Sequence, residues 1–402
     1  MKPFLTLDQG AFRGRRVLVR VDFNVPLDAN GKITDDLRIR ESLPTIQRLA
    51  KAGGRLILCS HLGRPGGKRE PSLSLKPVAA HLSKLLGKDV AFSDDCIGAK
   101  AEEAAKKLKD GEVLLVENLR YHKAEEENNP EFVESLAALG ELYVNDAFGT
   151  AHRAHASTEG VARHLPSYAG ELMRKELDAL GGLFATPAKP FVAVLGGSKV
   201  SGKIDVIKNL LPRVDTILVG GAMAFTFSKA KGGRVGGSLV EEDKVGLAKQ
   251  ILQEARERNV EILLPVDVVA TTNIKGHGEN RVVPFGEVPP DWKGVDIGPK
   301  TVKLFGERIV RAKTVVFNGP MGVFEVKDFA AGTRGVFAAA ADSQGTTIVG
   351  GGDSAAAIQQ CGFADQVTHV STGGGASLEF LEGKTLPGVA ALQRHAQAIV
   401  KP

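Results

Sequence analysis

The chain has 402 residues, of which 43% are hydrophobic and 25% are charged, and its formal net charge is +5. This length corresponds to about two to three ordinary domains, and the composition excludes a disordered protein. No apolar run is long enough to span a membrane, and the first residues do not form the apolar core of a signal peptide. We therefore expect a cytoplasmic protein that does not bind membranes.

The three cysteines are Cys59, Cys96 and Cys361, which are widely spaced and form no CxxC pair. An odd number at such spacing predicts neither a disulfide framework nor a cysteine-based zinc site. Residues 1–70 hold 14 basic against 7 acidic residues, which favours a negatively charged ligand. Because only 5% of residues are aromatic, a stacking platform for nucleic acid is not expected, and a small anion is the better candidate.

Short apolar, β-branched runs alternate with amphipathic segments along the whole chain. The predicted strands are Val17–Val21, Leu56–Cys59, Val113–Val116, Leu142–Val144, Phe191–Leu195, Thr216–Val219, Glu261–Leu264, Thr314–Phe317, Thr346–Val349 and Val367–Val370. The predicted helices between them include Ser42–Lys51, Ala99–Lys109, Pro130–Leu139, Lys244–Arg258 and Lys300–Arg311. Apolar strands joined by helices indicate parallel sheets that are buried on both faces.

So many strands favour an α/β protein with two doubly wound, Rossmann-like domains over one very wide sheet. Residues 171–188 are predicted to form a hinge helix and linker, because a helical pattern from Glu171 to Leu183 is followed by a proline-containing stretch. The expected domains are residues 1–170 and 189–386.

Polar residues follow four of the strands in the first domain, where ligands of open parallel sheets bind. Asp22 and Asn24 follow the first strand, and His61 and Arg64 follow the second. The third and fourth strands are followed by segments that contain Arg120 and Arg153, and Arg38 in the loop-like segment 34–40 could join them. A single arginine in a loop is more often solvated, but several at neighbouring strand ends favour an anion site. A lone histidine is more often structural, so His61 is interpreted at most as a donor to an anion.

In the second domain, Gly197–Lys203 matches the first part of a Walker A motif. Ile204 stands where that motif requires serine or threonine to hold magnesium, so a true P-loop is not expected. Glycine amides with Lys199 and Lys203 on roughly one helix face can still contact phosphate. The alternative is a tight turn with solvated lysines.

Three more glycine-rich turns follow strands and precede predicted helices: Gly220–Ala222, Gly350–Ser354 and Gly373–Ser377. None completes the dinucleotide fingerprint GxGxxG, because Leu378 stands where its third glycine belongs. This argues against a nicotinamide-dependent dehydrogenase. Asp353 is either an N-cap or a ligand for a magnesium ion bound with a nucleotide.

Six motifs, in order and spread over residues 17 to 390, closely resemble the phosphoglycerate kinase family. They are Val19–Pro26, His61–Pro65, Asn145–Ala156, Gly197–Lys203, Phe317–Glu325 and Gly350–Ser354. The resemblance implies reversible, Mg²⁺-dependent phosphoryl transfer between 1,3-bisphosphoglycerate and ADP, giving 3-phosphoglycerate and ATP in glycolysis. It also implies a monomer in which residues 387–402 pack back on the N-terminal domain.

The resemblance assigns the glycerate to the N-terminal domain and the nucleotide to the C-terminal domain. Its implied glycerate-site residues are Asp22, Phe23, Asn24, Arg38, His61, Leu62, Gly63, Arg64, Arg120 and Arg153. Its implied nucleotide-site residues are Lys203, Gly220, Gly221, Gly294, Asn318, Glu325, Gly351, Gly352, Asp353 and Ser354. Arg38, Lys199 and Lys203 would be catalytic, and Asp353 would hold Mg²⁺.

The chemistry agrees with this resemblance. A carboxylate or phosphate oxygen is already ionised at neutral pH, so the transfer needs no general base. It needs alignment, positive charge and closure of a hinge that excludes water. The remaining alternative, a polyanion-binding module built on residues 1–70, leaves the glycine turns of the second half unexplained.

Overall fold

The computed structural model describes residues 3–400 and divides the chain into two compact units. Unit 1 comprises Met1–Asp178 and Thr385–Pro402, and unit 2 comprises Ala179–Lys384. Residues 1, 2, 401 and 402, which the expected N-terminal domain and C-terminal segment include, lie outside the described residues. None of the described helices is both long enough and apolar enough to cross a membrane.

In the described part of unit 1, six parallel strands form one sheet in the order β3-β4-β2-β1-β5-β6. They are β1 Arg16–Arg20, β2 Arg55–Cys59, β3 Val90–Ser93, β4 Val113–Val116, β5 Leu142–Asn145 and β6 Ser167–Ala169. Val17 at the centre pairs with Leu56 on one side and with Leu142 on the other. Every residue of β4 and β5 is buried, as expected for a sheet covered on both faces.

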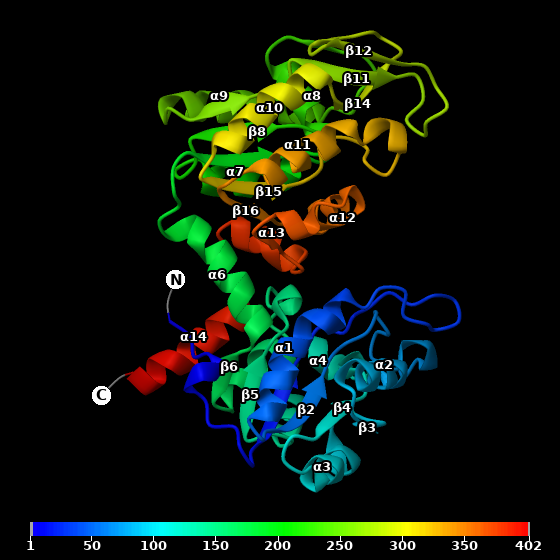
Figure 1. Cartoon of the computed structure of the whole chain (residues 1–402), viewed down its shortest axis with the longest axis vertical. Helices are drawn as coiled ribbons and strands as arrows, with labels where there is room; N and C mark the ends of the chain where they lie inside the picture. The colour runs from blue at the N-terminus through cyan, green and yellow to red at the C-terminus, as the bar shows by residue number, and fades with distance from the viewer. Residues whose placement is uncertain (1–2, 401–402) are drawn as a thin grey trace. The chain divides into compact units, whose positions relative to one another are not determined.

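Helices cover the two faces of this sheet (Figure 1). They are α1 Leu37–Lys51, α2 Lys76–Leu86, α3 Gly98–Lys107, α4 Lys123–Glu126 and α5 Pro130–Ala137. Val17 and Val19 point into the core that α1 and α2 share, whereas Leu18 points into the core of α3 and α5. This alternation within one strand positions the polar residues that follow it at a fixed edge of the sheet.

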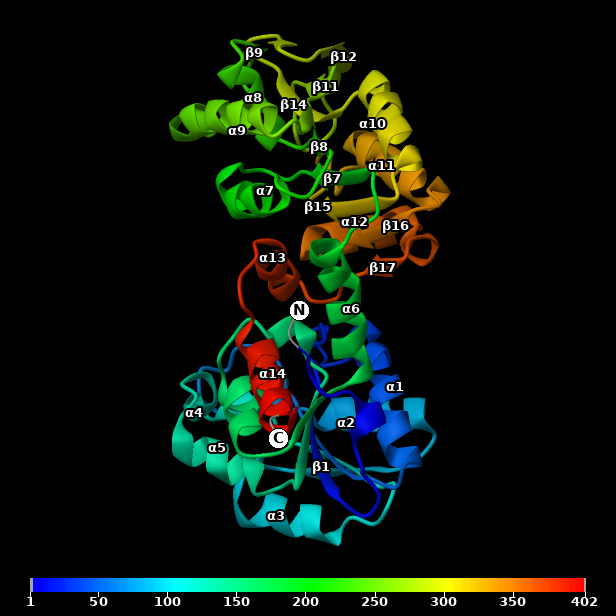
Figure 2. The ribbon, with the colours of Figure 1, turned by 90° about the vertical axis from the view of Figure 1, so that its left-hand side faces the viewer.

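The helix α6, Glu171–Ala185, contains the point at which the two units divide. The last helix, α14 Pro387–Val400, packs on β6 and on the segment Ala156–Arg163 of unit 1 (Figure 2). Its start is held by a hydrogen bond from the Gly388 amide to the Ala151 carbonyl, 2.9 Å long. The C-terminal segment therefore belongs to the same unit as the N-terminus of the chain.

In unit 2, six described parallel strands form a second sheet in the order β10-β8-β7-β15-β16-β17. They are β7 Phe191–Leu195, β8 Thr216–Val219, β10 Glu261–Leu263, β15 Thr314–Asn318, β16 Thr346–Val349 and β17 His369–Val370. The connecting helices are α7 Ile204–Leu210, α8 Met223–Ala230, α9 Val245–Glu257, α10 Pro299–Arg311, α11 Ala331–Asp342, α12 Gly352–Cys361 and α13 Gly375–Leu381. Within this unit α7 to α9 lie on one side of the sheet and α10 to α12 on the other (Figure 2).

Two further small sheets were not expected from the sequence. An antiparallel sheet has the order β12-β11-β14, with β11 Asp267–Thr271, β12 Asn280–Pro284 and β14 Lys293–Ile297. A two-stranded ladder joins β9 Arg234–Val235 to β13 Glu287–Val288. Both lie in unit 2, and the first contributes to the cavity described below.

The prediction of two parallel-sheet α/β units is confirmed, although the strands β3 and β6 were missed. The prediction that Arg38 lies in a loop is wrong, because α1 begins at Leu37, five residues before the predicted start. Asp36 precedes the helix and accepts a 2.8 Å hydrogen bond from Arg40, one turn later. This pairing extends the helix toward its N-terminus and places Arg38 in the first turn.

Candidate active site

Each parallel sheet has a point at which the strand order reverses. In unit 1 the strands β2 and β5 flank β1, and in unit 2 the strands β8 and β15 flank β7. Ligands of such sheets bind beyond the carboxyl ends of the strands at this point. Most candidate residues of the two units lie in segments that follow these strands or the further strands β4 and β16, whereas Arg38 lies in α1 and Gly294 lies in β14.

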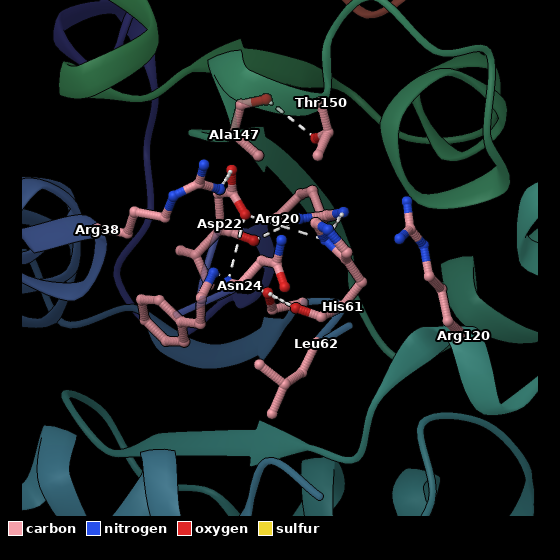
Figure 3. Close-up of polar contacts among 12 residues, drawn as sticks. Arg20, Asp22, Asn24, Arg38, His61, Leu62, Arg120, Ala147 and Thr150 are labelled. Atoms are coloured by element: carbon pink, nitrogen blue, oxygen red, sulfur yellow. Dashed lines mark hydrogen bonds and ion pairs between the residues drawn. The ribbon is translucent and has the colours of Figure 1, made fainter. Parts of the chain in front are cut away.

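In unit 1, four charged or polar side chains form a connected network at the ends of β1 and β2 (Figure 3). Arg38 reaches Asp22 from α1, with its Nη1 atom 2.6 Å from the Oδ2 atom. The other Asp22 oxygen lies 3.9 Å from Nδ1 of His61, and that nitrogen lies 3.1 Å from Nη2 of Arg20. The network therefore runs from a half-exposed arginine through a buried carboxylate and imidazole to a buried arginine.

His61 is held neutral in this network. Burial lowers its pKa well below the usual value, and the positive charges of Arg20, Arg120 and Arg38 lower it further. Arginine can only donate hydrogen bonds, so Nδ1 of His61 accepts the bond from Arg20 and its proton lies on Nε2. His61 can therefore donate a hydrogen bond to an anion without carrying charge.

Asn24 and Arg120 both bind the backbone of Gly63, in the loop after β2. The Asn24 side-chain oxygen accepts a hydrogen bond from the Gly63 amide at 2.9 Å, and Arg120 donates to the Gly63 carbonyl at 2.9 Å. Phe23 and Leu62 are fully buried beside them and fix the two loops by packing. Nε of Arg120 is buried and has no hydrogen-bond partner among the described residues, although it lies 3.3 Å from a Glu126 oxygen.

Two of the expected residues are not joined to this network. Arg64 follows Gly63 but its side chain is exposed. Arg153 is half-buried, and its Nε atom contacts the ring of His152 at 3.3 Å. The structure thus brings Asp22, Arg38 and His61 together directly, whereas Arg64 and Arg153 lie in the loops after their strands and are not hydrogen-bonded to that group.

In unit 2, Lys203 and three loops converge where β7, β15 and β16 end. The Lys203 ammonium donates a hydrogen bond to the Asn318 side-chain oxygen, and the Asn318 amide donates to the Gly350 carbonyl at 2.9 Å. Ser354, in the first turn of α12, accepts a 2.6 Å hydrogen bond from the Gly319 amide. Burial lowers the pKa of Lys203, and the nearby carboxylates of Asp353 and Glu382 oppose this shift.

At two of the predicted nucleotide-site positions, the backbone conformation and the close packing require glycine. Gly221 has a φ of +67°, and a Cβ atom there would lie 2.5 Å from the backbone of Gly197. Gly351 has a φ of +96°, where a Cβ atom would lie 2.9 Å from the Asn318 side chain. These two turns can therefore pack so closely at the strand ends only because these positions lack side chains.

A cavity of about 310 Å³ opens beside these turns. Gly221, Gly294, Glu325 and Asp353 line it, together with apolar residues of α8, β14 and the loop 320–324. Gly294 lies in β14. A Cβ atom at this position would lie 2.0 Å from the Phe225 ring, so any side chain would clash with this wall of the cavity. An apolar, glycine-lined cavity with a few polar groups has the form of a nucleotide pocket.

One expectation for this unit is wrong, and one of the two alternatives for Asp353 is excluded. Lys199 and Lys203 do not share a helix face, because residues 196–200 form a loop and the 3-10 helix begins only at Ser201. Lys199 is exposed, whereas Lys203 points toward Asn318. Asp353 is not an N-cap either, because Gly351 occupies that position and Asp353 lies within the first turn of α12. Its exposed carboxylate remains available to a ligand of the cavity.

Two buried charged or titratable residues beside these sites were not predicted from the sequence. Arg20 is 1% exposed and donates a 2.9 Å hydrogen bond to Ser157, which in turn binds the buried Glu125. An arginine within the apolar run of β1 was the available signal. Asp296 lines the cavity, and burial raises its pKa to about 7, but it lies in a strand that was not predicted.

The two α/β units carry an arginine-containing network at the strand ends of one unit and a glycine-lined cavity in the other, an arrangement that suits a phosphotransferase. The sequence model of the family described as phosphoglycerate kinase matches residues 7–384. The chain is 59% identical over 384 residues to a phosphoglycerate kinase of Chlorobium phaeobacteroides (strain BS1), covering 94% of this chain and 97% of the relative. It is 58% identical over 387 residues to that of Koribacter versatilis (strain Ellin345), covering 94% and 96%.

Two solved structures are also similar. The phosphoglycerate kinase from Coxiella burnetii has a TM-score of 0.91 at 43% identity and covers 98% of this chain and 100% of its own. That from Pyrococcus horikoshii OT3 has a TM-score of 0.84 at 37% identity, with coverage of 98% and 99%. The chain belongs to the phosphoglycerate kinase family, and it is an enzyme that transfers a phosphoryl group to a carboxyl group.

Proposed function

We propose that this chain catalyses reversible phosphoryl transfer between 1,3-bisphosphoglycerate and ADP, giving 3-phosphoglycerate and ATP in glycolysis, as a cytoplasmic monomer. The observation that carries this proposal is the network of Arg38, Asp22, His61 and Arg20 at the strand ends of unit 1. It concentrates positive charge and a neutral donor, and its one carboxylate, Asp22, is bound by Arg38. Such a site suits an anion that takes part in transfer without forming a bond to the protein.

In this proposal 3-phosphoglycerate binds in unit 1. Asp22 and Asn24 would accept or orient the hydroxyl group, and His61 would donate from Nε2 to an anionic oxygen. Arg64, Arg120 and Arg153 would bind the phosphate that is not transferred. This role would explain why Arg64 and Arg153 lie apart from the Arg38 network. Arg38 has five N–H donors and uses one for Asp22, so others remain for the transferred phosphoryl group.

The nucleotide binds in the cavity of unit 2. Gly220, Gly221, Gly294 and Asn318 would contact its base and sugar side, and Glu325 would bind the ribose. The turn Gly351–Ser354 and Lys203 would hold its phosphates, with Lys199 reaching them from the preceding loop. Asp353 fits Mg²⁺, because its carboxylate is exposed at the rim of this cavity and Mg²⁺ prefers oxygen ligands. When bound, Mg²⁺ supplies positive charge to the nucleotide phosphates.

No general base is needed in either direction. The attacking oxygen belongs to a carboxylate of 3-phosphoglycerate or to a phosphate of ADP, and both are ionised at neutral pH. Arg38 and Lys203 would stabilise the charge that develops on the transferring group, and the side chains around them would align the in-line transfer.

The proposal also requires closure. Phosphoryl transfer needs the donor and acceptor oxygens to meet, so ligands held by different units must be brought together by bending near residues 171–188. Closure would also exclude the water that would otherwise hydrolyse the acyl phosphate.

A coupled assay tests this function. The purified chain should convert 3-phosphoglycerate and MgATP to ADP, and ADP formation should stop when either 3-phosphoglycerate or Mg²⁺ is omitted. The Arg38→Ala variant should lose this activity, whereas Lys51→Ala, at the exposed C-terminal end of the same helix, should retain it. ADP formation that is independent of 3-phosphoglycerate would contradict the proposed acceptor.

A further inference from the structure

Three side chains of the types that bind transition metals meet in unit 1, away from the proposed substrate residues. Asp95 and Cys96 follow β3, and His122 follows the 3-10 helix Leu119–Tyr121, which comes after β4. One carboxylate oxygen, the sulfur and one ring nitrogen all lie within 4.8 Å of one another. We propose that Asp95, Cys96 and His122 form a binding site for Zn²⁺, with solvent at the fourth position.

The fold explains how residues 26 positions apart in the sequence come together. The strands β3 and β4 are neighbours and parallel, so the segments that follow them lie at the same edge of the sheet. The Asp95 carboxylate accepts hydrogen bonds of 2.7 Å from the Cys96 amide and from Nε2 of His122. The Ser93 hydroxyl binds the Asp95 carbonyl at 2.9 Å and fixes the turn after β3. The side chains of both segments are therefore preorganised before any metal binds.

The donor set matches zinc. Sulfur, imidazole nitrogen and carboxylate oxygen are its common ligands, with bonds of about 2.0–2.3 Å, so ligand atoms in a tetrahedral site are about 3.3–3.8 Å apart. The distance between Nε2 of His122 and the Asp95 oxygen, now 2.7 Å, would increase by about 0.6 Å to reach the lower end of this range. On binding, the Cys96 thiol would lose its proton to solvent and coordinate as thiolate. The proton on Nε2 of His122 would pass through solvent to Nδ1, so that Nε2 coordinates as a neutral imidazole nitrogen.

The burial of the three groups agrees with an open site. Cys96 is fully buried among apolar residues that include Ile57 and Ala101, so packing against the core fixes the position of its sulfur. The side chains of Asp95 and His122 are 36% and 31% exposed, which leaves the solvent side free for water. A competing charge is also present, because Nη2 of Arg69 lies 3.9 Å from the other Asp95 oxygen. We therefore expect weaker binding than in a closed structural zinc site.

The proposed site differs in kind from the cysteine-based zinc site that the sequence does not predict. The cysteines are too far apart in sequence to suggest a zinc site built from cysteines, and that reasoning still holds for Cys59 and Cys361. The proposed site needs only one cysteine, because the parallel pairing of β3 and β4 supplies the histidine and the carboxylate. It uses none of the residues proposed to bind 3-phosphoglycerate or nucleotide.

Titration with Co²⁺ tests the site in the full chain after dialysis against a chelator. Co²⁺ bound through a thiolate gives a sulfur-to-cobalt charge-transfer band in the near ultraviolet, which an oxygen site such as that of Asp353 cannot give. We expect this band to saturate at one equivalent of Co²⁺ and to disappear when Zn²⁺ is added. The absence of the band in the wild-type protein would overturn the proposal.

Variants locate the ligands. Cys96→Ser should abolish the band, and His122→Ala and Asp95→Asn should each weaken Co²⁺ binding by about 10-fold or more. Cys361→Ser and the exposed His164→Ala serve as matched controls and should leave the titration unchanged.

Circular dichroism checks that each variant is folded. If Cys96→Ser is not folded, the Co²⁺ affinities of His122→Ala and Asp95→Asn decide. A band that survives in folded Cys96→Ser, or binding that is unchanged in both His122→Ala and Asp95→Asn, would refute the site.

Discussion

Arg38 is the side chain whose removal should affect catalysis most. It lies in the first turn of α1, is 37% exposed and is oriented by Asp22 at 2.6 Å. A guanidinium directed at a transferring phosphoryl group acts mainly as charge redistributes in the transition state, so Arg38→Ala should lower kcat by about 10³-fold or more. Steady-state kinetics with both substrates varied checks this. A variant with unchanged kcat and a raised KM for 3-phosphoglycerate would make Arg38 a residue of substrate binding only.

Substitution of Lys203 tests the proposed nucleotide site of unit 2. Its ammonium is partly buried and binds Asn318, beside the cavity. Loss of a charged hydrogen bond to phosphate should weaken nucleotide affinity by about 10-fold or more in Lys203→Ala, whereas 3-phosphoglycerate affinity should not change. Calorimetric titration of each ligand measures both, and the exposed Lys208→Ala in α7 is the control. Equal losses for the two ligands would show that the nucleotide assignment is wrong.

At the scale of elements, Asp146 connects β5 to the start of α6. Its Oδ1 atom accepts hydrogen bonds from the amides of Leu172 and Met173, at 2.9 and 3.4 Å. Burial raises the pKa of Asp146 from its ordinary 3.8 to about 8. Between these two values the native protein keeps a proton that the unfolded chain releases, so rising pH lowers the free energy of unfolding by up to about 1.4 kcal/mol per pH unit.

Asp146→Asn should remove this pH dependence, because an amide keeps the acceptor and cannot ionise. The stability of the variant relative to wild type should therefore rise as the pH increases from 4 to 8. Urea unfolding of both proteins across this range measures the difference, and Asp89→Asn, at an exposed position of the same unit, controls for the loss of one carboxylate. A difference that does not vary with pH would show that Asp146 is ionised in the native protein.

The elements also show what the sequence could predict. Apolar strands such as Phe191–Leu195 were found because all five residues are buried, and burial on both faces leaves a continuous apolar run. The edge strand β3 was missed because it is only partly buried, and β6 was missed because its three residues, Ser167–Ala169, form no continuous apolar run. In β12 four of the five residues are exposed, so no hydrophobic pattern marks it.

For the sites too, only features that are marked by a local sequence pattern could be predicted. Residues directly after a strand, such as Asp22 and His61, could be predicted to lie together because parallel strands end at one edge of a sheet. The contact of Lys203 with Asn318 joins positions 115 residues apart and depends on the pairing of β7 with β15, which no local pattern specifies. Gly294 was known only through the family resemblance, because its role depends on the Phe225 ring that packs against it.

At the scale of the whole molecule, the central claim is that each unit binds one substrate and that the pair of substrates closes the enzyme. A ligand shifts a conformational equilibrium only by its differential affinity for the two states, and one substrate alone contacts mostly its own unit. The complete set of substrates should therefore favour closure more than either ligand does.

Small-angle X-ray scattering measures this most directly, with 3-phosphoglycerate, Mg²⁺ and a non-reacting ATP analogue. The radius of gyration should fall slightly with either ligand alone and most with both, at concentrations shown by calorimetry to saturate each site. In the Lys203→Ala variant, at concentrations that saturate only its 3-phosphoglycerate site, the radius of gyration should fall only as far as it does with 3-phosphoglycerate alone. A radius of gyration that stays constant from the free enzyme to the saturated ternary complex would contradict the account.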